Sequence, residues 1–292
     1  MTRSVITGAS TGIGRATALR LAREGHEVHA SVRSLDSGAE LLDAGDGLDL
    51  SLVVMDVDDD ESVIAAFTSI ERDRGPIDVL VNNAGVAAGA SIEETPLTDF
   101  VRLMNTNTWG ALRCVQAVLP SMRERGAGAI INVTSLAGVL AQGGQGAYVA
   151  SKFALEGLTE VLAIEARPFG IRVSAIEPGV IKTPIFSKGS GGAVVETPYV
   201  GARRMGEVFR STLGGRPGTP DEVAEVIWTA LTSDEPKLRY EVGDDAERML
   251  AYRSSVTDEA WVERQSETDD DVFRSWISDV SGVEVRANNA PR

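Results

Sequence analysis

Short apolar segments alternate with longer segments of helical periodicity along most of this 292-residue chain. Helical spacing of apolar residues covers 12–24, 62–72, 96–125 and 145–167, and strand-like runs occupy 3–7, 26–32, 52–55, 77–81, 129–134, 171–176 and 238–242. Strict alternation requires a parallel sheet, because each strand reaches the next through a helix packed on one face. We therefore expect an α/β fold, a doubly wound parallel sheet of about seven strands with helices on both faces.

The pattern changes after Pro178. Residues 187–192 read Ser-Lys-Gly-Ser-Gly-Gly, which is typical of a flexible segment, and helical patterns follow at 200–213 and 220–231. We expect one main domain over residues 1–243, with a lid at about 185–219. Residues 244–292 are expected to form an extension of short helices that ends in an acidic, polar tail.

The formal net charge of −15 restricts the partners of the chain. Nucleic acid and anionic membranes are not expected, because phosphate contacts require clustered Lys and Arg. No apolar run approaches the roughly 18 residues of a membrane span, and Met1 to Ser4 lead into a strand without the apolar core of a signal peptide. We expect a soluble, cytoplasmic protein with no membrane span.

Cysteine and histidine are too scarce to build most metal or nucleophile sites. Cys114 is the single cysteine and stands in an apolar helical segment, so a packed thiol is expected. The two histidines, His26 and His29, fall in one predicted strand and offer little material for a zinc site or a His-based triad. An acid or base must therefore come from other side chains.

A glycine-rich loop, Gly8-Ala-Ser10-Thr11-Gly12-Ile13-Gly14, joins the first strand to the first helix. In this position backbone N–H groups and the positive helix end can meet a nucleotide pyrophosphate. Gly8 allows the tight turn, Gly12 allows the backbone to approach the phosphates, and Gly14 allows the helix to pack closely on the strand. Ser10 and Thr11 offer hydroxyls that can donate hydrogen bonds. A turn without a ligand is the alternative.

The end of the second strand bears on the choice of nicotinamide cofactor. An acidic residue there would bind the ribose 2′-hydroxyl and repel a 2′-phosphate. Arg33 and Ser34 instead supply a guanidinium and a hydroxyl, and Arg15 offers a second charge. Asp36 argues for the opposite preference, and a solvated Arg33 is the alternative. We expect NADP(H) rather than NAD(H).

Tyr148 and Lys152 are four residues apart in a helical segment, so both project from one face. An ammonium beside a phenol lowers the tyrosine pKa from about 10 and suits it to act as general acid and base. Ser135 follows the fifth strand, at the sheet edge where open α/β folds bind ligands. Taken singly, Ser135 is typical of a turn, and Asn107 of a surface or packing position.

Together these blocks resemble the short-chain dehydrogenase/reductase family in its single-domain form, over about residues 3–243. The resemblance rests on seven ordered blocks: Thr7 to Gly14, Asp56-Val57, Asn82-Asn-Ala-Gly85, Asn107 in Asn-Thr-Trp-Gly, Ser135, Tyr148-x-x-x-Lys152, and Pro178-Gly179 with Thr183. It implies a Rossmann-type sheet and an oxidoreductase that transfers a hydride between NADP(H) and a ketone, an aldehyde or a secondary alcohol.

The resemblance also implies a role for each matching residue. Tyr148 would exchange the proton, Ser135 hold the substrate oxygen, and Lys152 tune Tyr148 and bind the nicotinamide ribose. Asn107 would hold a water that links Lys152 to solvent. Asp56 and Val57 would contact the adenine, Asn83 and Ala84 would line the adenosine side, and Ile181 and Thr183 would contact the nicotinamide carboxamide. The further cofactor-binding residues would be Gly85, Pro178 and Gly179.

Two features depart from the commonest family pattern. The last strand reads Leu-Arg-Tyr-Glu-Val-Gly243 instead of containing Val-Asp-Gly-Gly, and the chain continues to Arg292. With Ser-Lys-Phe-Ala-Leu-Glu-Gly157, this ending resembles the hydroxysteroid and retinol dehydrogenase branch. A homodimer through helices 96–125 and 146–167 is expected before a tetramer through the last strand.

The main alternative is a catalytically silent NADP(H)-binding regulator or interaction protein, which would usually lack the Tyr, Lys or Ser found here. A sugar-nucleotide epimerase or dehydratase would carry a Thr-Gly-x-x-Gly-x-x-Gly loop and a larger C-terminal domain. An enoyl reductase would place its Lys farther from the Tyr. A hydrophobic ketone or alcohol is the expected substrate, with buried packing as the alternative for each candidate pocket residue: Val139, Leu140, Gln142, Ile185, Phe186 and Tyr199.

Overall fold

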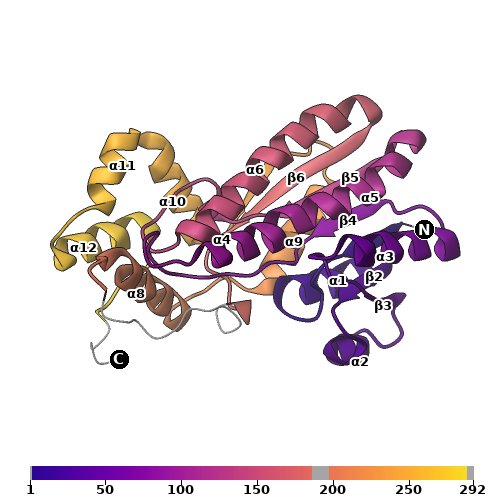
Figure 1. Cartoon of the computed structure of the whole chain (residues 1–292), viewed down its shortest axis with the longest axis horizontal. Helices are drawn as coiled ribbons and strands as arrows, with labels where there is room; N and C mark the ends of the chain where they lie inside the picture. The colour runs from indigo at the N-terminus through magenta and orange to yellow at the C-terminus, as the bar shows by residue number, and fades with distance from the viewer. Residues whose placement is uncertain (1, 186–196, 288–292) are drawn as a thin grey trace.

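A computed structural model of the chain describes residues 2–185 and 197–287. Its centre is a wholly parallel sheet of seven strands in the order β3-β2-β1-β4-β5-β6-β7 (Figure 1). The strands are β1 (Arg3–Ile6), β2 (Glu27–Val32), β3 (Leu50–Val54), β4 (Val79–Asn82), β5 (Gly128–Val133), β6 (Ile171–Pro178) and β7 (Arg239–Val242). The predicted α/β fold is confirmed. The strand order reverses between β1 and β4, and ligands of such sheets bind where the loops at this point diverge.

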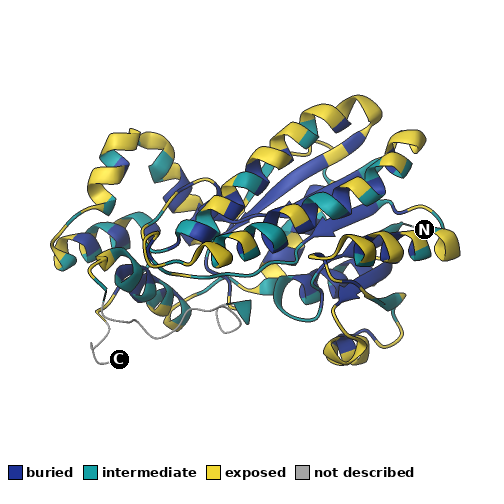
Figure 2. Ribbon diagram, in the orientation of Figure 1, coloured by how far each residue is buried: buried dark blue, intermediate teal, exposed yellow. Residues whose placement is uncertain are grey.

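Helices cover both faces of the sheet and create two hydrophobic cores. On one face lie α1 (Gly12–Arg23) and α9 (Pro220–Thr232), and on the other α3 (Asp60–Arg74), α5 (Gly110–Arg125) and α6 (Gly146–Ala166). Successive strand residues alternate between the cores, so that Ile131 faces the first and Ile130 the second. The central strands β4 and β5 are buried on both faces (Figure 2), which explains why their residues are mostly apolar.

The segment predicted as one helix over 96–125 has three parts. α4 (Leu97–Met104) is followed by a π-helical turn (Asn105–Trp109), which continues directly into α5. The Thr95-Pro96 pair is typical of an N-cap residue followed by proline at the first helical position, but the helix begins at Leu97 with Pro96 as its N-cap residue. The Thr95 hydroxyl instead donates to the Ser91 carbonyl at 2.7 Å, within the preceding turn.

Two short elements near β3 escaped prediction. A 3₁₀ turn (Leu35–Gly38) and α2 (Ala39–Ala44) follow β2. A helix of six residues spans fewer than two turns, so it shows no apolar periodicity that a sequence pattern could reveal.

The chain after β7 forms three helices that pack against α8 (Val200–Gly214). They are α10 (Asp244–Ser255), α11 (Asp258–Gln265) and α12 (Asp270–Ser281), and they lie together at one end of the sheet (Figure 1). A third hydrophobic cluster joins them, with Val208 of α8 packed among Met249, Trp261 and Phe273. The extension is therefore an integral part of this end of the molecule.

Cys114 is buried in the second core, where burial raises the pKa of its thiol to about 12. A thiol of this kind is unreactive, as expected for a packing residue. Within residues 2–185 and 197–287, no helix combines the length and apolar character needed to cross a membrane. Over the same ranges no grouping of His, Cys, Asp and Glu is suited to a metal ion.

Candidate active site

The polar residues singled out by the sequence gather where the parallel strands end. The glycine loop follows β1, Asn83 and Gly85 follow β4, Ser135 follows β5 and Gly179 follows β6. These strands are consecutive neighbours in the sheet, so their loops share one edge. The structure thus brings together residues that are far apart in the sequence.

The glycine loop is held in shape by Asn83. Gly8 and Gly12 have φ angles of 64° and 60°, which favour glycine. The Asn83 side-chain amide donates to the carbonyl oxygens of Thr7 and Gly8 at 2.9 and 3.2 Å, and a Cβ on Gly14 would clash with that amide. Asn83 therefore supports the loop, a structural role that the sequence did not suggest.

The surroundings of this loop suit a phosphate-rich dinucleotide. The first turn of α1 contains no acidic residue, so its N-terminal end remains favourable to anions. Arg15 has a buried Nε atom without a hydrogen-bond partner in the described part of the chain. Arg33 and Ser34 are exposed at the end of β2, and Arg33 forms no ion pair with any described residue. Asp36 is exposed nearby in the 3₁₀ turn.

Asp56 and Val57 occupy different environments after β3. Asp56 is exposed, and its carboxylate accepts a hydrogen bond from the Asp58 N–H at 3.0 Å. Val57 is buried against α5, where a Cβ on Gly110 would lie 2.9 Å from its Cγ2. The Val57 side chain thus packs in the protein core, while Asp56 faces solvent.

The segment after β6 crosses to the glycine loop. The Gly179 N–H donates to the Val242 carbonyl at 2.9 Å, and Ile181 forms a bridge with Gly218. Beyond it, Thr183 lies against the loop, since a Cβ on Gly12 would be 3.2 Å from the Thr183 Cγ2. The predicted nicotinamide contacts therefore lie beside the predicted phosphate loop.

Ser135, Tyr148 and Lys152 converge beside this edge. The Ser135 hydroxyl is hydrogen-bonded to the Tyr148 phenol. Lys152 lies one helical turn after Tyr148 in α6, and its Nζ is 5.8 Å from the centre of the tyrosine ring. The Nζ donates to the Val133 carbonyl at 3.0 Å. A phenol, a second hydroxyl and an ammonium thus share one site.

Burial dominates the titration of this site. Burial raises the pKa of Tyr148 above its ordinary value of 10, and the hydrogen bond from Ser135 opposes the rise. Burial lowers the pKa of Lys152 to about 8, with the Glu156 carboxylate opposing. The sequence predicted a lowered pKa for Tyr148, but the structure gives a raised pKa, because desolvation outweighs the hydrogen bond from Ser135.

Asn107 lies in the π-helical turn and is buried. Its amide nitrogen donates to the Val86 carbonyl and to the Ser151 hydroxyl, each at 2.9 Å, and its amide oxygen accepts from the Val86 N–H at 2.8 Å. A Cβ on Gly85 would lie 3.3 Å from the Asn107 Oδ1 and 3.9 Å from the Lys152 Nζ. Asn107 therefore fixes the chain after β4 next to Lys152, and π-helical turns often occur at such sites.

A cavity that is partly open to solvent adjoins Ser135 and Tyr148. Of the six predicted pocket residues, Gln142 lines this cavity. Leu140 is fully buried in the third cluster, Val139 and Tyr199 are exposed, Ile185 is half-buried, and Phe186 lies outside the described residues. The Tyr199 hydroxyl donates to the Glu93 carboxylate.

Most of the cavity wall was missed by sequence reasoning. The lining residues are Ser135, Leu136, Ala137, Gln142, Gln145, Tyr148, Gly179, Val180, Met205, Val208, Phe209, Thr212, Asp245, Met249 and Ser281. Gln145 could have been found, because it precedes Tyr148 by three residues and so lies near it at the start of α6. The residues from α8, α10 and α12 carried no such signal.

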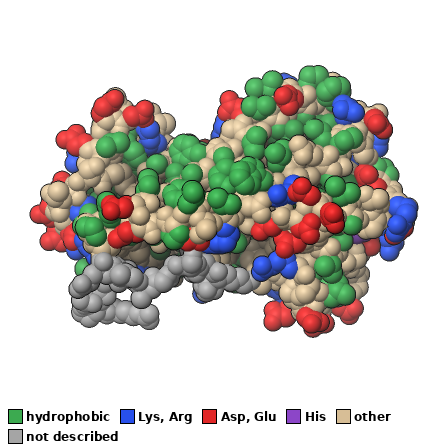
Figure 3. Space-filling model, in the orientation of Figure 1, with side chains coloured by type: hydrophobic (Ala, Val, Ile, Leu, Met, Phe, Trp, Pro, Cys, Tyr) green, Lys and Arg blue, Asp and Glu red, His purple; other side chains and the backbone are tan. Residues whose placement is uncertain are grey.

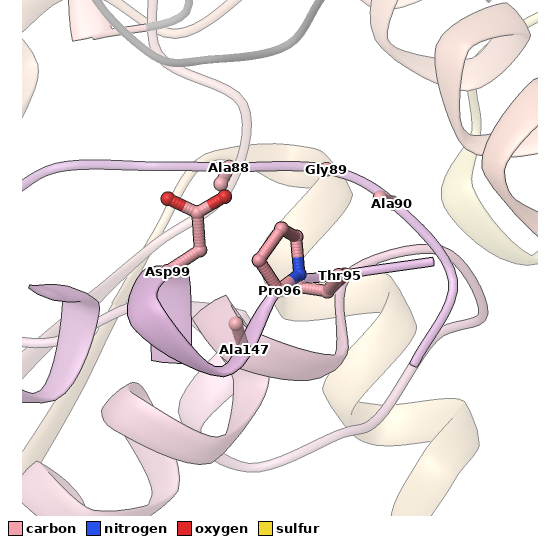
Figure 4. Close-up of a pocket in the computed structure, with 7 residues that line it drawn as sticks. All are labelled: Ala88, Gly89, Ala90, Thr95, Pro96, Asp99 and Ala147. Carbon is pink, nitrogen blue, oxygen red and sulfur yellow. The ribbon is translucent and has the colours of Figure 1, made fainter. Parts of the chain in front are cut away.

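A second cavity lies between the loop after β4 and the first turns of α4 and α6. Figure 4 shows its lining, which is Ala88, Gly89, Ala90, Thr95, Pro96, Asp99 and Ala147. Asp99 is the one ionisable residue in the described part of this lining, and it pairs with Arg102 at 3.2 Å. This cavity holds no combination of acid, base and nucleophile comparable to Ser135, Tyr148 and Lys152.

Comparison with known proteins agrees with this geometry. A family model described as short chain dehydrogenase matches residues 3–191. An uncharacterized oxidoreductase of Bacillus subtilis (strain 168) is 34% identical over 267 residues, covering 88% of this chain and 95% of the relative. The 17-beta-hydroxysteroid dehydrogenase type 1 of Homo sapiens is 36% identical over 260 residues, covering 82% of this chain and 77% of the relative.

Solved structures give the same result. A short-chain dehydrogenase from Streptomyces avermitilis superposes with a TM-score of 0.79 at 33% identity, covering 91% of this chain and 98% of that one. ElxO with NADP bound superposes with a TM-score of 0.71 at 27% identity, covering 82% and 96% of the two chains. The chain therefore belongs to the short-chain dehydrogenase family and is an oxidoreductase.

Proposed function

We propose that this protein interconverts hydrophobic ketones or aldehydes and the corresponding alcohols, using NADP(H) and Tyr148 as general acid and base. The observation that carries the proposal is the convergence of Ser135, Tyr148 and Lys152 on one cavity edge beside the glycine loop. A bound nicotinamide cofactor would supply or accept the hydride, which leaves the protein to handle one proton and one oxygen.

The three side chains divide this work. In reduction, the Tyr148 phenol donates its proton to the substrate oxygen, and the Ser135 hydroxyl donates a hydrogen bond to the same oxygen as negative charge develops on it. Because burial raises the pKa of Tyr148, the phenol holds its proton at neutral pH, which suits reduction. Protonated Lys152 places a cationic group beside the phenol. Asn107 holds the segment after β4 in position beside it.

Two arginines support a preference for NADP(H). A 2′-phosphate beyond β2 would meet the exposed guanidinium of Arg33 and the Ser34 hydroxyl, as arginine recognises phosphate through paired N–H donors. Arg15 has an unpartnered buried Nε on the adjacent helix, among the described residues. The NADP-bound state of the structural relative ElxO agrees with this preference, whereas Asp36 would favour NAD(H).

The cavity supports a hydrophobic substrate. Leu136, Val180, Val208 and Met249 contribute apolar side chains to a wall that also carries Ser135 and Tyr148. The hydroxysteroid dehydrogenase name of the human relative fits a substrate of this kind. We infer that the reacting carbonyl enters next to the two hydroxyls and that the apolar body of the substrate lies toward α8 and α10.

We also propose a homodimer formed through α4, α5 and α6. α4 and α6 expose large apolar side chains, and Trp109 is exposed in the turn between α4 and α5; apolar side chains gather on the face that Figures 1 and 3 turn to the viewer. The exposed fractions reach 76% at Leu97 and 68% at Ile164. Apolar surface on helices of one face is typical of an isologous interface. Light scattering at a mass of one 30.9 kDa chain would contradict the proposal.

The proposed reaction is tested by following NADPH absorbance with steroid, retinoid, quinone and aliphatic carbonyl compounds. Turnover of at least one hydrophobic carbonyl, faster with NADPH than with NADH, is the expected result. Enhanced NADPH fluorescence without turnover of any compound, in either direction, would favour a silent cofactor-binding protein and contradict the proposal.

A further inference from the structure

The chain after β7 supplies part of the wall of the substrate cavity. α10 contributes Asp245 and Met249, and α12 contributes Ser281. The same helices pack against α8, which provides Met205 and Val208 on the adjoining wall. The extension and α8 therefore form one packed unit that determines the shape and polarity of the cavity away from the sheet edge.

Among the residues that the structure describes, Asp245 is the one carboxylate in this lining. It stands in the first turn of α10, is 8% exposed, and its Oδ2 accepts a hydrogen bond from the Val180 N–H at 2.8 Å. Its Oδ1 touches the backbone of Gly179, since a Cβ on that glycine would clash with it. Two contacts thus hold the carboxylate at the start of the segment that leads from β6 to Thr183.

The second oxygen of this carboxylate has no hydrogen-bond partner among the described residues. In residues 2–185 and 197–287, no Lys, Arg or His pairs with Asp245, and no group donates a hydrogen bond to its Oδ1. The Oδ1 is not fully enclosed and so keeps access to the cavity. Its neighbours in the lining include the apolar Met205, Val208 and Met249. A carboxylate in such surroundings gains free energy from any ligand group that donates a hydrogen bond to it.

We propose that Asp245 selects, among hydrophobic carbonyl and alcohol substrates, those with a second group that donates a hydrogen bond, such as a hydroxyl or an ammonium. A substrate carboxylate would face a like charge in the cavity and would be rejected. The inference rests on the proposed function, because it assumes that the reacting oxygen meets Ser135 and Tyr148 while the remainder of the molecule extends toward Asp245.

The test uses four ketones with one carbon skeleton that end in a methyl, a hydroxyl, an ammonium or a carboxylate group. Binding to the full chain is measured by calorimetry with NADP⁺ present, so that no hydride is available for reduction. The hydroxyl and ammonium ketones should bind wild-type protein at least about tenfold more tightly than the carboxylate ketone. Equal binding of the carboxylate ketone would overturn the inference without any variant.

Asp245→Asn removes the charge and keeps an oxygen that can accept from the Val180 N–H. In this variant the carboxylate ketone should gain and the ammonium ketone lose about tenfold in affinity, while the methyl ketone changes by less than about twofold. Asp244→Asn is the matched control, because Asp244 is exposed in the same helical turn and carries the same charge. Equal effects of the two variants would overturn the inference.

The binding measurement separates this inference from the proposed reaction. Charge discrimination at Asp245 without turnover of any ketone would contradict the reaction and support the carboxylate as a binding determinant. Normal turnover without charge discrimination would overturn the inference alone. If Asp245→Asn fails to fold, the binding of the four ketones to the wild-type protein still tests the inference, because equal binding of the carboxylate ketone would overturn it.

Discussion

The Nζ of Lys152 lies 5.8 Å from the centre of the Tyr148 ring and donates to the Val133 carbonyl at 3.0 Å. The ammonium is thus held against the end of β5, beside the phenol, in a place where burial disfavours its charge. This arrangement is costly for folding, and a buried ammonium of this kind points to a functional role. Residues retained at such a cost are characteristic of functional sites.

Lys152→Met should therefore stabilise the protein without cofactor and abolish its activity. The folded-state pKa of about 8 lies below the ordinary 10.5, so folding of the wild-type chain is penalised below pH 8, and the penalty fades between pH 8 and 10.5. At pH 7 the free energy of unfolding of the variant should exceed that of the wild type by about 1 to 3 kcal/mol. This difference should vanish above pH 10.5.

Chemical denaturation of both proteins across this pH range is the measurement. Lys237→Met is the matched control, because Lys237 is exposed and its loss should change the stability little. If the variant is less stable than wild type at pH 7, interactions of the Lys152 ammonium in the folded protein outweigh the cost of its desolvation, which would contradict the prediction.

Arg33→Asp should shift the cofactor preference from NADPH toward NADH. The substitution removes a guanidinium that faces solvent at the end of β2 and introduces a carboxylate, which repels a 2′-phosphate and can bind a 2′-hydroxyl. The ratio of kcat/KM for the two cofactors should fall by about tenfold to a hundredfold. Arg23→Asp, at the exposed far end of α1, is the control for the change in charge. An unchanged ratio would show that Arg33 does not contact the phosphate.

The carboxyl ends of β6 and β7 hold a second buried ionisable group. Glu177 is 2% exposed, and its Oε1 lies 3.4 Å from the Nε of Arg239, which also binds Glu156 at 3.0 Å. Burial raises the pKa of Glu177 to about 7, with Glu156 and Glu241 adding to the rise and Arg239 opposing it. A raised carboxyl pKa lowers stability as the pH rises from 4.5 to 7.

Glu177→Gln should remove this pH dependence. The variant and the wild type should have similar unfolding free energies below pH 4.5, and the variant should be more stable by roughly 1 to 3 kcal/mol above pH 7. Glu160→Gln is the control, because Glu160 also pairs with Arg239, at 2.7 Å, but is 54% exposed, and such pairs contribute little. Parallel stability curves for Glu177→Gln and wild type would contradict the raised pKa.

The fold and the main site were predictable because their signals are local. β-α alternation fixed the sheet, and the spacing of Tyr148 and Lys152 placed both on one face of α6. What the sequence could not reveal depends on burial and on distant contacts. The direction of the Tyr148 pKa follows from desolvation, which the spacing of residues does not encode.

The substrate wall illustrates the same limit of sequence patterns. Asp245 reaches the cavity only because α10 packs back against the segment after β6, and nothing in its local sequence indicates this contact. The π-helical turn around Asn107 is a further case, since the amide is directed inward by an irregularity of the helix.

The most direct test of the account is the turnover of Tyr148→Phe with a carbonyl compound that the wild-type protein reduces. The substitution removes the transferable proton and keeps the ring, so kcat should fall by about 10² to 10⁴ while the NADPH dissociation constant changes by less than about twofold. Tyr240→Phe, on β7 outside the cavity lining, should retain full activity. Turnover of Tyr148→Phe near the wild-type rate would contradict the assignment of Tyr148 as the proton donor.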